Sequence, residues 1–467
     1  MTAPLEVARR ALAGTAAWTV GGAVRDGLRG AGPGVDVDLV IDGDVRAAAQ
    51  TLARAAGAVA FELSDEFGAW RVVTRDRAWQ ADLNPVRGGS LTADLRLRDF
   101  TVNAIAQPLA GGELIDPLGG AADLAAGRLR LAAPAALSAD PLRTLRLVRL
   151  ACELGLEPDP EARGAAQAAA PGLNGVAAER VFGELKRIVA SPRAVAGLRM
   201  AGELGLSAVV LPELDAMAGV EQNRYHHRDV AGHTLEVLES LIGLEDDPAA
   251  MLGDAHADAV RAHLGAPLAD DLTRGEALRF GALLHDVAKP ATRRVGEDGR
   301  VMFLGHDELG AVMARAILGR LRSSDRLQTH VAALVRHHLR LGFLVHAAPL
   351  DRRAVYRYLD ASDAVAADVT LLSVADRLAT RGARSEEAIA RHLELAREML
   401  GEALAWHEHG RPAPLLRGDR LAGELGIEPG PRLGKLLAEL AEAEFAGVAT
   451  TPGEALDLAR MLVSGER

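Results

Sequence analysis

Short strand-like runs of apolar residues alternate with a turn and helical segments in the first 115 residues, a pattern that indicates a sheet combined with helices. We predict five strands, over residues 16–20, 35–41, 58–62, 70–74 and 80–83. A glycine turn and a helix-like segment over residues 21–30 join the first two strands, and residues 100–106 are predicted to be helical. The expected fold class is therefore α+β, with a small mixed sheet and helices at the N-terminal end.

The rest of the chain carries the longer spacing of apolar positions that is typical of helices. Residues 142–154 are the clearest case, because Asp140 can cap a helix there and Pro141 fits its first turn. Further helices are predicted over residues 161–169, 177–190 and 192–204. Residues 246–270 are acidic and weakly periodic, so we expect an insertion or loop. Residues 410–414 are rich in glycine and proline and should interrupt the last helical segment.

Changes in pattern and composition divide the chain into four regions, over residues 1–115, 116–220, 221–390 and 391–467. Only the first region combines strands with helices, and the other three are expected to be all-α. All 14 histidines lie at or beyond His226, so the two halves of the chain should carry different chemistry.

Composition narrows the class of protein. A net charge of −11 argues against a non-specific coat for nucleic acid, although it leaves room for a local basic face. Cys152 is the single cysteine, which excludes an intramolecular disulfide and fits a reducing cytoplasm. The sequence lacks a signal-peptide pattern and an apolar run long enough to cross a bilayer. We therefore expect a soluble, cytoplasmic protein without a membrane partner; no pattern indicates an oligomeric state.

The most informative motif is the glycine pair Gly21-Gly22 followed by Asp36 and Asp38. Side chains two residues apart on a strand point to the same face, so the two carboxylates can act together. Carboxylate oxygens suit Mg²⁺, while glycines and a helix start suit the phosphates of a nucleotide. The combination predicts a nucleotidyl-transfer site, with Asp82 on a neighbouring strand as a weaker candidate for a third ligand.

A second set of polar residues follows downstream. Arg98-Asp99 precedes the segment predicted to be helical over residues 100–106, and Asp140 lies one helical turn before Arg143. A carboxylate and a guanidinium at that spacing supply an acceptor and donors that can select a base edge without a template. Arg143, Arg146 and Arg149 share one side of the same helix. Each part alone is common as a turn, a cap or a solvated helix face, and the order of the parts is the specific signal.

These motifs in this order resemble the class II tRNA nucleotidyltransferases, the bacterial CCA-adding family that includes poly(A) polymerases. The resemblance implies a polymerase-β-like nucleotidyltransferase head (residues 1–115) and a helical neck (residues 116–220) with base-selecting and RNA-binding elements. It also implies Mg²⁺ as cofactor and the tRNA 3′ end as partner. The family's catalytic and triphosphate-binding motif corresponds here to Gly21, Gly22, Arg25, Asp26, Asp36 and Asp38.

Two of the family's later motifs are present with one substitution each. Residues 97–99 are Leu-Arg-Asp where the family has R-R-D, and residues 139–143 begin with Ala where the family's E-D-x-x-R begins with Glu. The resemblance implies contacts of Arg98 and Asp99 with the sugar and of Asp140 and Arg143 with the base.

The neck also offers candidates for contacts with tRNA phosphates. Glu179-Arg180 resembles the family's later neck motif. Arg180, Lys186, Arg187 and Arg193 are the basic residues nearby, and a solvated helix face is an equally good interpretation of them.

The link between the last predicted strand of the head and Arg98 is short. CCA-adding members carry a flexible loop there that helps them change from CTP to ATP, and residues 82–94 resemble the loop deletion of CC-adding relatives. The resemblance therefore implies an enzyme that adds two C residues from CTP, with ATP as a further substrate only if addition continues to A.

The histidine-rich half carries a second motif, in which His233, the pair His285-Asp286 and Asp376 follow one another along the chain. Imidazole and carboxylate ligands together suit a divalent transition metal, and His285-Asp286 lies in an apolar segment where polar groups need partners. The pattern resembles the HD phosphohydrolases, an HD domain that some CCA-adding enzymes carry after the neck. That resemblance implies Mn, Ni, Co, Fe or Mg on these four residues and hydrolysis of phosphomonoesters or 2′,3′-cyclic phosphates. His306 and His337 match the extra positions of binuclear members.

Several alternatives remain open from the sequence. The same motifs occur in full CCA-adding enzymes, A-adding enzymes and poly(A) polymerases. The protein could instead act mainly as an HD phosphohydrolase with a head that only binds nucleotide or RNA, although intact Asp36 and Asp38 argue against this. Conversely, the HD fold could be degenerate and merely support tRNA. Residues 391–467 are expected to form a helical tail.

Overall fold

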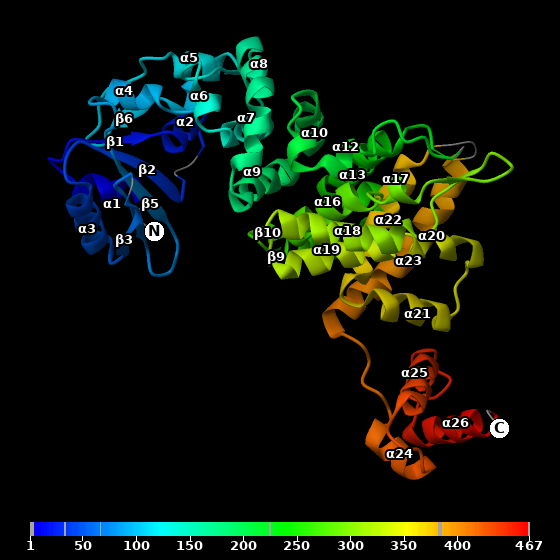
Figure 1. The fold of residues 1–467 in the computed structure, drawn as a ribbon. Helices are drawn as coiled ribbons and strands as arrows, with labels where there is room; N and C mark the ends of the chain where they lie inside the picture. Colours follow the sequence, from blue (N-terminus) through cyan, green and yellow to red (C-terminus); the bar gives the residue numbers. More distant parts are fainter. Residues whose placement is uncertain (1–3, 32–33, 66, 224–225, 382–384, 466–467) are drawn as a thin grey trace. The chain divides into compact units, whose positions relative to one another are not determined.

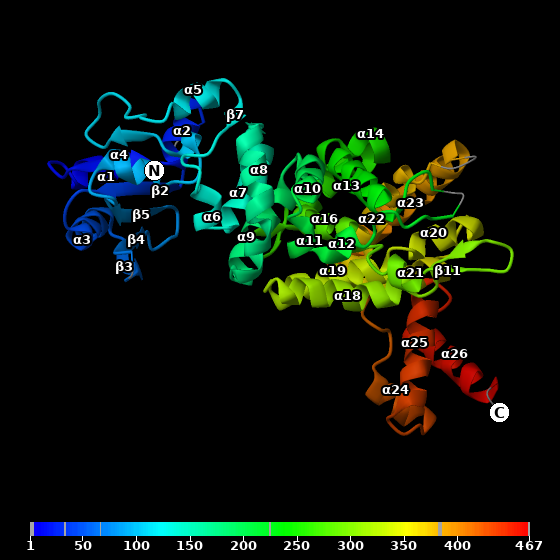
Figure 2. The ribbon, with the colours of Figure 1, turned by 45° about the horizontal axis from the view of Figure 1, so that its top comes forward.

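The computed structural model describes residues 4–31, 34–65, 67–223, 226–381 and 385–465. The chain forms two compact units, Met1–Val210 and Leu211–Arg467 (Figures 1 and 2). The first contains the mixed sheet and the helices that follow it, and the second is almost entirely helical. The predicted α+β fold class, with an N-terminal mixed sheet followed by helical regions, is confirmed.

The first unit is built on a six-stranded sheet with the strand order β3-β4-β5-β2-β1-β6. The strands are β1 (Ala17–Val20), β2 (Asp36–Ile41), β3 (Val59–Ser64), β4 (Ala69–Val73), β5 (Gln80–Pro85) and β6 (Ala106–Pro108). β2 and β5 run parallel, and the other neighbours are antiparallel. The five predicted strands are all present, within two residues at each end.

The two faces of this sheet are covered differently. One face packs its buried residues, among them Leu39, Val72 and Leu83, against α1 (Pro4–Ala11) and α3 (Val45–Ala56). On the opposite face the described residues form a smaller core, which covers the part made by β1, β2 and β6. That core joins Val20, Val40 and Ala106 to Leu95 of α4 (Leu91–Arg96) and to Ala104.

The predicted helix over residues 100–106 is wrong. Thr101–Asn103 form a single 3₁₀ turn, η1, and Ala106 then pairs as a strand with Val20. Phe100, Val102 and Ile105 are fully buried. A segment that is buried nearly throughout shows neither the alternation of a strand nor the spacing of an amphipathic helix, so its apolar pattern does not distinguish the two.

The helices predicted over residues 142–154, 161–169, 177–190 and 192–204 are present as four of the remaining helices of the first unit, and α7, α9 and α10 pack on one another. The remaining helices are α2 (Gly22–Leu28), α5 (Gly120–Ala125), α6 (Ala136–Ala139), α7 (Leu142–Leu154), α8 (Pro160–Ala169), α9 (Ala178–Ala190), α10 (Ala194–Glu203) and α11 (Ser207–Val210). The 3₁₀ helix η2 (Ala170–Gly175) and the strand pair β7 (Arg128–Leu129) and β8 (Glu157–Pro158) complete the unit. Pro141 occupies the N-cap position of α7, and the Asp140 carboxylate accepts from the N–H of Leu142 at 3.2 Å.

The second unit consists of helices with two short hairpins. Its elements before residue 345 are α12 (Pro212–Asp215), α13 (Val230–Asp246), α14 (Pro248–Leu252), α15 (Asp254–Gly265), β9 (Pro267–Ala269), β10 (Leu272–Thr273), α16 (Arg274–Leu284), α17 (Lys289–Thr292), β11 (Arg294–Val295), β12 (Val301–Met302), α18 (His306–Arg320), α19 (Asp325–His337) and α20 (Arg340–Leu344). After them come η3 (Val345–Ala347), α21 (Arg352–Ser362), η4 (Asp363–Val365), α22 (Ala366–Ala379), α23 (Ser385–His409), α24 (Gly418–Leu425), α25 (Pro431–Phe445) and α26 (Pro452–Gly465).

Residues 246–270 are not the expected loop. They form α14, α15 and β9, and α15 buries Val260 and Leu264 while packing against α16. The acidic residues that suggested a loop lie on the solvent side of α15, for example Asp258. The predicted interruption at residues 410–414 is present between α23 and α24, and the last three helices enclose a core of their own around Leu421 and Leu440. No described helix is both long and apolar enough to cross a membrane.

Candidate active sites

The two aspartates of the head lie on the sheet face that is only partly covered. Asp36 and Asp38 are exposed on β2, while Val37 and Leu39 between and beyond them are buried on the other side. This alternation is what the pleat of a strand requires. The pair therefore presents its carboxylates on one face, as the sequence predicts.

Asp82 lies beside this pair, on the parallel neighbour β5, in register with Asp38. Arg71 of β4 is in register with Asp82 and donates two hydrogen bonds to its carboxylate, each of 2.7 Å. Asp82 thus already has a cationic partner, and Asp36 and Asp38 are the carboxylates left to bind a metal ion.

The environment of Asp38 favours an added cation. Although Asp38 is accessible to solvent, the surrounding protein partly desolvates its carboxyl and raises its pKa; the charges of Asp82 and Asp36 raise it further, while Arg98 and Arg146 act in the opposite direction. A divalent ion would relieve this repulsion, so the donor set fits Mg²⁺.

The glycine turn lies against the same carboxylate. Gly21 has a φ of 68°, and a Cβ on it would lie 3.4 Å from Arg98 Nη1 and 3.5 Å from Asp38 Oδ2. The left-handed backbone conformation therefore favours glycine here, while a Cβ would make only ordinary van der Waals contacts. The turn, Arg98 and Asp38 form one compact corner at the end of β1 and β2.

Arg25 is held within the protein. Its guanidinium donates to Asn103 Oδ1 at 2.6 Å and to Asp26 at 2.8 Å and 3.0 Å, and the side chain is 11% exposed. Arg25 therefore fixes α2 to η1. The predicted contact of Arg25 with a triphosphate stays a prediction.

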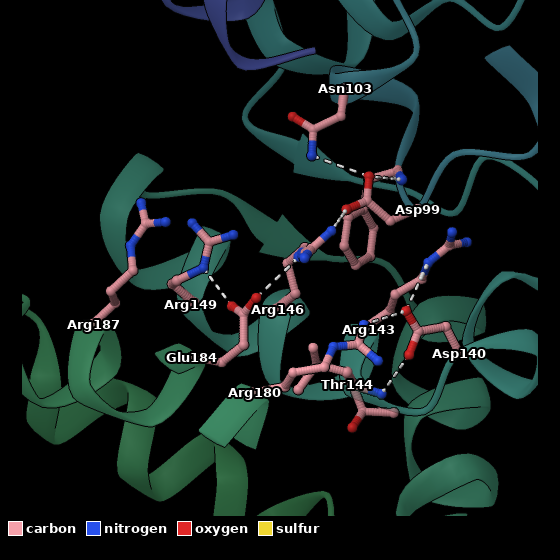
Figure 3. A network of polar contacts seen from close by, with 12 residues as sticks. Asp99, Asn103, Asp140, Arg143, Thr144, Arg146, Arg149, Arg180, Glu184 and Arg187 are labelled. Atoms are coloured by element: carbon pink, nitrogen blue, oxygen red, sulfur yellow. Dashed lines mark hydrogen bonds and ion pairs between the residues drawn. The ribbon is translucent and has the colours of Figure 1, made fainter. Parts of the chain in front are cut away.

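Asp99 anchors the network that joins the head to the helices after it (Figure 3). One oxygen accepts from the Phe100 N–H at 2.8 Å and from Asn103 at 3.1 Å, and the other accepts from Arg146 at 3.2 Å. Burial acts to raise the pKa of Asp99, but these donors, led by Arg146, hold it below its ordinary value.

The arginines of α7 share Glu184 of α9, which the sequence did not single out (Figure 3). Arg146 donates to Glu184 at 3.1 Å and Arg149 at 2.5 Å, and Arg149 also reaches Glu153 at 2.7 Å. Arg146 therefore lies between Asp99 and Glu184, whereas Arg149 is buried in contacts with two glutamates. This geometry gives Arg149 a bracing position, and its predicted contact with a nucleotide stays a prediction. Only the packing of α7 against α9 pairs these residues, so sequence spacing could not find Glu184.

The predicted base-selecting pair comes together. Arg143 Nε lies 3.9 Å from Asp140 Oδ2, and Arg143 also donates to the backbone carbonyls of Leu97 and Arg98 at 3.2 Å and 3.3 Å. Burial lowers the pKa of the Arg143 guanidinium. The pair is thereby tied to the segment that carries Arg98 and Asp99.

The two arginines of α9 are engaged in ion pairs. Arg180 contacts Asp140 at 3.1 Å, and Arg187 donates to Glu153 at 2.8 Å and 3.0 Å. Both arginines are more than half exposed. Their predicted role in RNA binding, and that of Lys186, stays a prediction.

The four residues of the second predicted metal site converge from three helical segments. His233 lies on α13, His285-Asp286 directly follow α16, and Asp376 lies on α22. His233 Nε2 is 3.0 Å from Asp376 Oδ1 and 3.8 Å from Asp286 Oδ2, and His285 Nε2 is 3.1 Å from the latter oxygen. The structure therefore brings together residues up to 143 positions apart.

Two further histidines complete this cluster, and one of them corrects the sequence prediction. Asp286, His306 and His338 offer ligand atoms within 4.8 Å of one another, as do His233, His285 and Asp286. The predicted His337 is not in either group; its Nδ1 accepts a hydrogen bond from Arg340. The apolar stripe of α19, Val331, Leu334 and Val335, is buried and continues to His338, so helix phase could have distinguished the two.

The imidazoles of this histidine site are oriented for a metal. The Nδ1–H groups of His285, His306 and His338 donate to the carbonyls of residues 282, 303 and 335 at 2.6–2.8 Å. Their Nε2 atoms are buried and make no well-aligned hydrogen bond among the described residues, although that of His285 lies 3.1 Å from Asp286 Oδ2. Asp286 forms an ion pair with Lys289 at 2.6 Å, and its other ion-pair contacts with described residues are to histidines. Such backbone contacts fix the tautomer that presents Nε2 to a metal.

Two of the buried imidazoles beside Asp286 have pKa values shifted in opposite directions: burial acts to lower the pKa of His285, but the charge of Asp286 outweighs it and raises this pKa. Burial and the neighbouring His285 lower the pKa of His338 to about 4, so this ring is neutral at physiological pH, as a metal ligand must be. The cluster opens into a cleft of about 510 Å³ that Lys289, Arg300, Arg377 and Phe343 also line.

Three family models match the chain. They are the poly A polymerase head domain over residues 17–130, the probable RNA and SrmB-binding site of polymerase A over residues 155–217, and the HD domain over residues 230–381.

Curated relatives match over nearly the whole length. The A-adding tRNA nucleotidyltransferase of Deinococcus radiodurans is 37% identical, with 93% of each chain covered. The CC-adding tRNA nucleotidyltransferase of Thermus thermophilus is 36% identical, with 94% of this chain and 92% of the relative covered. Among solved structures, the CCA-adding enzyme of Bacillus stearothermophilus in complex with CTP superposes with a TM-score of 0.63 at 21% identity and covers 100% of this chain and 99% of its own. At that identity the likeness concerns the fold.

Proposed function

Since this chain belongs to the tRNA nucleotidyltransferases of the CCA-adding type, we propose that it adds two C residues in succession to the tRNA 3′ end from CTP. The observation that carries the proposal is the short connection between the catalytic sheet and Arg98. β5 ends at Pro85 and α4 begins at Leu91. Within this connection and α4, the buried Asp94 accepts from Arg87 at 3.0 Å and from Arg98 at 3.3 Å. A connection that is this short, and that ion pairs hold in place, supports an enzyme that lacks the flexible loop associated with the change from CTP to ATP.

A addition is the second candidate, because the Deinococcus relative named as A-adding is as similar as the Thermus relative named as CC-adding. The test offers CTP alone, ATP alone and both to tRNA that lacks its CCA end and to tRNA that ends in CC. The proposal expects two C residues and then a stop. Efficient addition of AMP to tRNA ending in CC would contradict it.

The residues divide the chemistry among them. Asp36 and Asp38 would hold Mg²⁺, which in such sites neutralises the triphosphate and promotes attack by a hydroxyl. Arg98 stands beside Asp38 and the glycine turn, where it can balance phosphate charge. Asp140 and Arg143 would select the base. Arg146 bonds to both Asp99 and Glu184 and so holds the segment of Asp99 in place relative to α9.

Metal-dependent phosphohydrolysis in the second unit is a further part of the proposal. The observation that supports it is the set of buried Nε2 atoms gathered around Asp286. The ligands would be His233, His285, Asp286, His306, His338 and Asp376. A divalent metal held there would polarise a phosphoryl oxygen and activate water. Lys289 and Arg377 line the same cleft and suit a phosphomonoester or 2′,3′-cyclic phosphate.

The test of this part compares metal content and phosphatase activity in the wild type and in His285→Ala/Asp286→Ala. The proposal expects both to be lost in the variant while nucleotide incorporation remains. Equal metal content in the two proteins would exclude these residues as ligands.

The proposal keeps the four-part organisation, with a head over residues 1–115, a neck over 116–220, an HD domain over 221–390 and a helical tail over 391–467. It places the enzyme in the cytoplasm, where tRNA and CTP meet.

A further inference from the structure

The catalytic face of the head sheet continues into an exposed apolar edge. Strand register aligns Asp38 of β2 with Asp82 of β5, Asp82 with Arg71 of β4, and Arg71 with Phe61 of β3. Residues aligned across neighbouring strands share a face. Phe61 therefore lies on the same face as the catalytic aspartates, three strand spacings or about 14 Å from Asp38.

This part of the face has no cover among the described residues. The core on the catalytic side ends at β1, β2 and β6, where α4 and residues around Ala104 fill it. Beyond Asp82 the exposed fraction rises from β4 to β3: the side chain of Arg71 on β4 is 29% exposed, whereas Phe61 and Val59 on β3 are 45% and 52% exposed. Phe67, in the turn between β3 and β4, is 57% exposed.

An exposed apolar stripe with an aromatic side chain on the outermost strand needs a partner, because a bare apolar sheet edge promotes aggregation. The face on which it lies identifies the chemistry of that partner. The attacking strand must enter with its 3′-hydroxyl at Asp36 and Asp38, and its preceding nucleotides must leave across some part of this surface. The β1–β6 side is filled, so the open side runs over Arg71 towards Phe61.

We propose that Val59 and Phe61, the edge stripe, form a stacking platform for the unpaired nucleobases just upstream of the RNA 3′ end. Aromatic side chains bind bases through their π faces with little sequence preference, which suits a tRNA end whose discriminator base varies. Arg71 lies between platform and carboxylates and is held flat by its two bonds to Asp82. The inference rests on Asp36 and Asp38 being the catalytic pair.

The test uses the full-length enzyme and tRNA lacking its CCA end, with 2-aminopurine at each of the last three positions in turn. Phe61→Ser should weaken tRNA binding roughly tenfold and abolish the quenching of one of these probes, because stacking on an aromatic is lost. The KM for CTP should not change. Phe61→Trp should restore both signals, and Leu114→Ser, at another exposed apolar position of the same unit, should alter neither.

Three outcomes are decisive. Unchanged tRNA affinity and quenching in Phe61→Ser, with normal C addition, would overturn the platform alone. A stripe that instead seats a second copy of the chain would show as a dimer in the wild type that Phe61→Ser dissociates, without a change in quenching, and this too would overturn it. Absence of C addition in the wild type would contradict the proposed function rather than the platform.

Discussion

The head site, with Asp36 and Asp38, and the histidine site around Asp286 are both candidate metal sites, yet they are built in opposite ways. The head aspartates are exposed on an open sheet and have arginines as neighbours. The ligands around Asp286 are buried, and backbone carbonyls hold the imidazoles in one tautomer. We infer from this difference that the first site would receive a metal together with a triphosphate, whereas the second would retain a metal before any substrate arrives.

The largest effect should come from the head. Asp38→Ala should lower nucleotide incorporation by at least roughly 10²- to 10³-fold, because the charge that positions the cation is lost where negative charge develops on the substrate. Phosphatase activity and metal content should remain, since both belong to the other unit. Incorporation assays with a single turnover measure the first quantity. A variant that keeps wild-type incorporation would remove Asp38 from the catalytic pair.

The network behind the head site should be the next most sensitive. Glu184→Gln removes the charge that Arg146 and Arg149 share in a buried position, and we expect a loss of about 3 kcal/mol in unfolding free energy. Denaturant unfolding of the first-unit transition measures it. Glu153→Gln is the matched control, since Glu153 is more exposed and should cost less. Equal losses of unfolding free energy in the two variants would mean that Glu184 contributes no more to the network than Glu153 does.

The histidine site offers a comparison between two adjacent residues. His338→Ala should reduce metal content and weaken metal affinity by roughly 10-fold or more, because one Nε2 ligand is lost. His337→Ala should change neither, since His337 faces Arg340. Elemental analysis after dialysis distinguishes them, and loss of metal from the His337 variant alone would restore the original sequence prediction.

The smallest expected effect concerns acid stability. The pKa of Asp99 is lowered in the folded protein, so its contribution to stability is present above the unfolded-state pKa of about 4 and is lost as the pH falls through the folded value. Asp99→Asn should therefore flatten the loss of stability below about pH 4. Urea unfolding as a function of pH measures this slope. A slope identical to that of the wild type would exclude Asp99 as a contributor.

Local patterns in the sequence were enough for much of the fold. The strands of the head and α7 have clear periods, and the interruption after α23 is marked by Gly410 and Pro412. The helix prediction for residues 100–106 was wrong because an apolar segment that is buried nearly throughout has no period to distinguish helix from strand. The loop prediction for residues 246–270 was wrong because α15 buries few residues against its neighbours, including α16. Its apolar stripe is therefore weak in the sequence, and tertiary packing supplies the stability of the helix.

The same division holds for the site residues. Asp36, Asp38, Asp140 and Arg143 could be found because their spacing along one strand or one helix already brings them together. Glu184 and Asn103 could not, since only tertiary packing brings them to Arg146 and Arg25. His338 lay next to the predicted His337, and burial of one face of α19 decided between the two.

Metal content of the nucleotide-free enzyme tests the central contrast most directly. The comparison needs three proteins purified in parallel: wild type, Asp36→Ala/Asp38→Ala and His285→Ala/Asp286→Ala. The account predicts that the wild type and the head variant retain the same bound divalent metal and that the histidine-site variant loses it. Metal lost from the head variant but kept by the histidine-site variant would contradict the account.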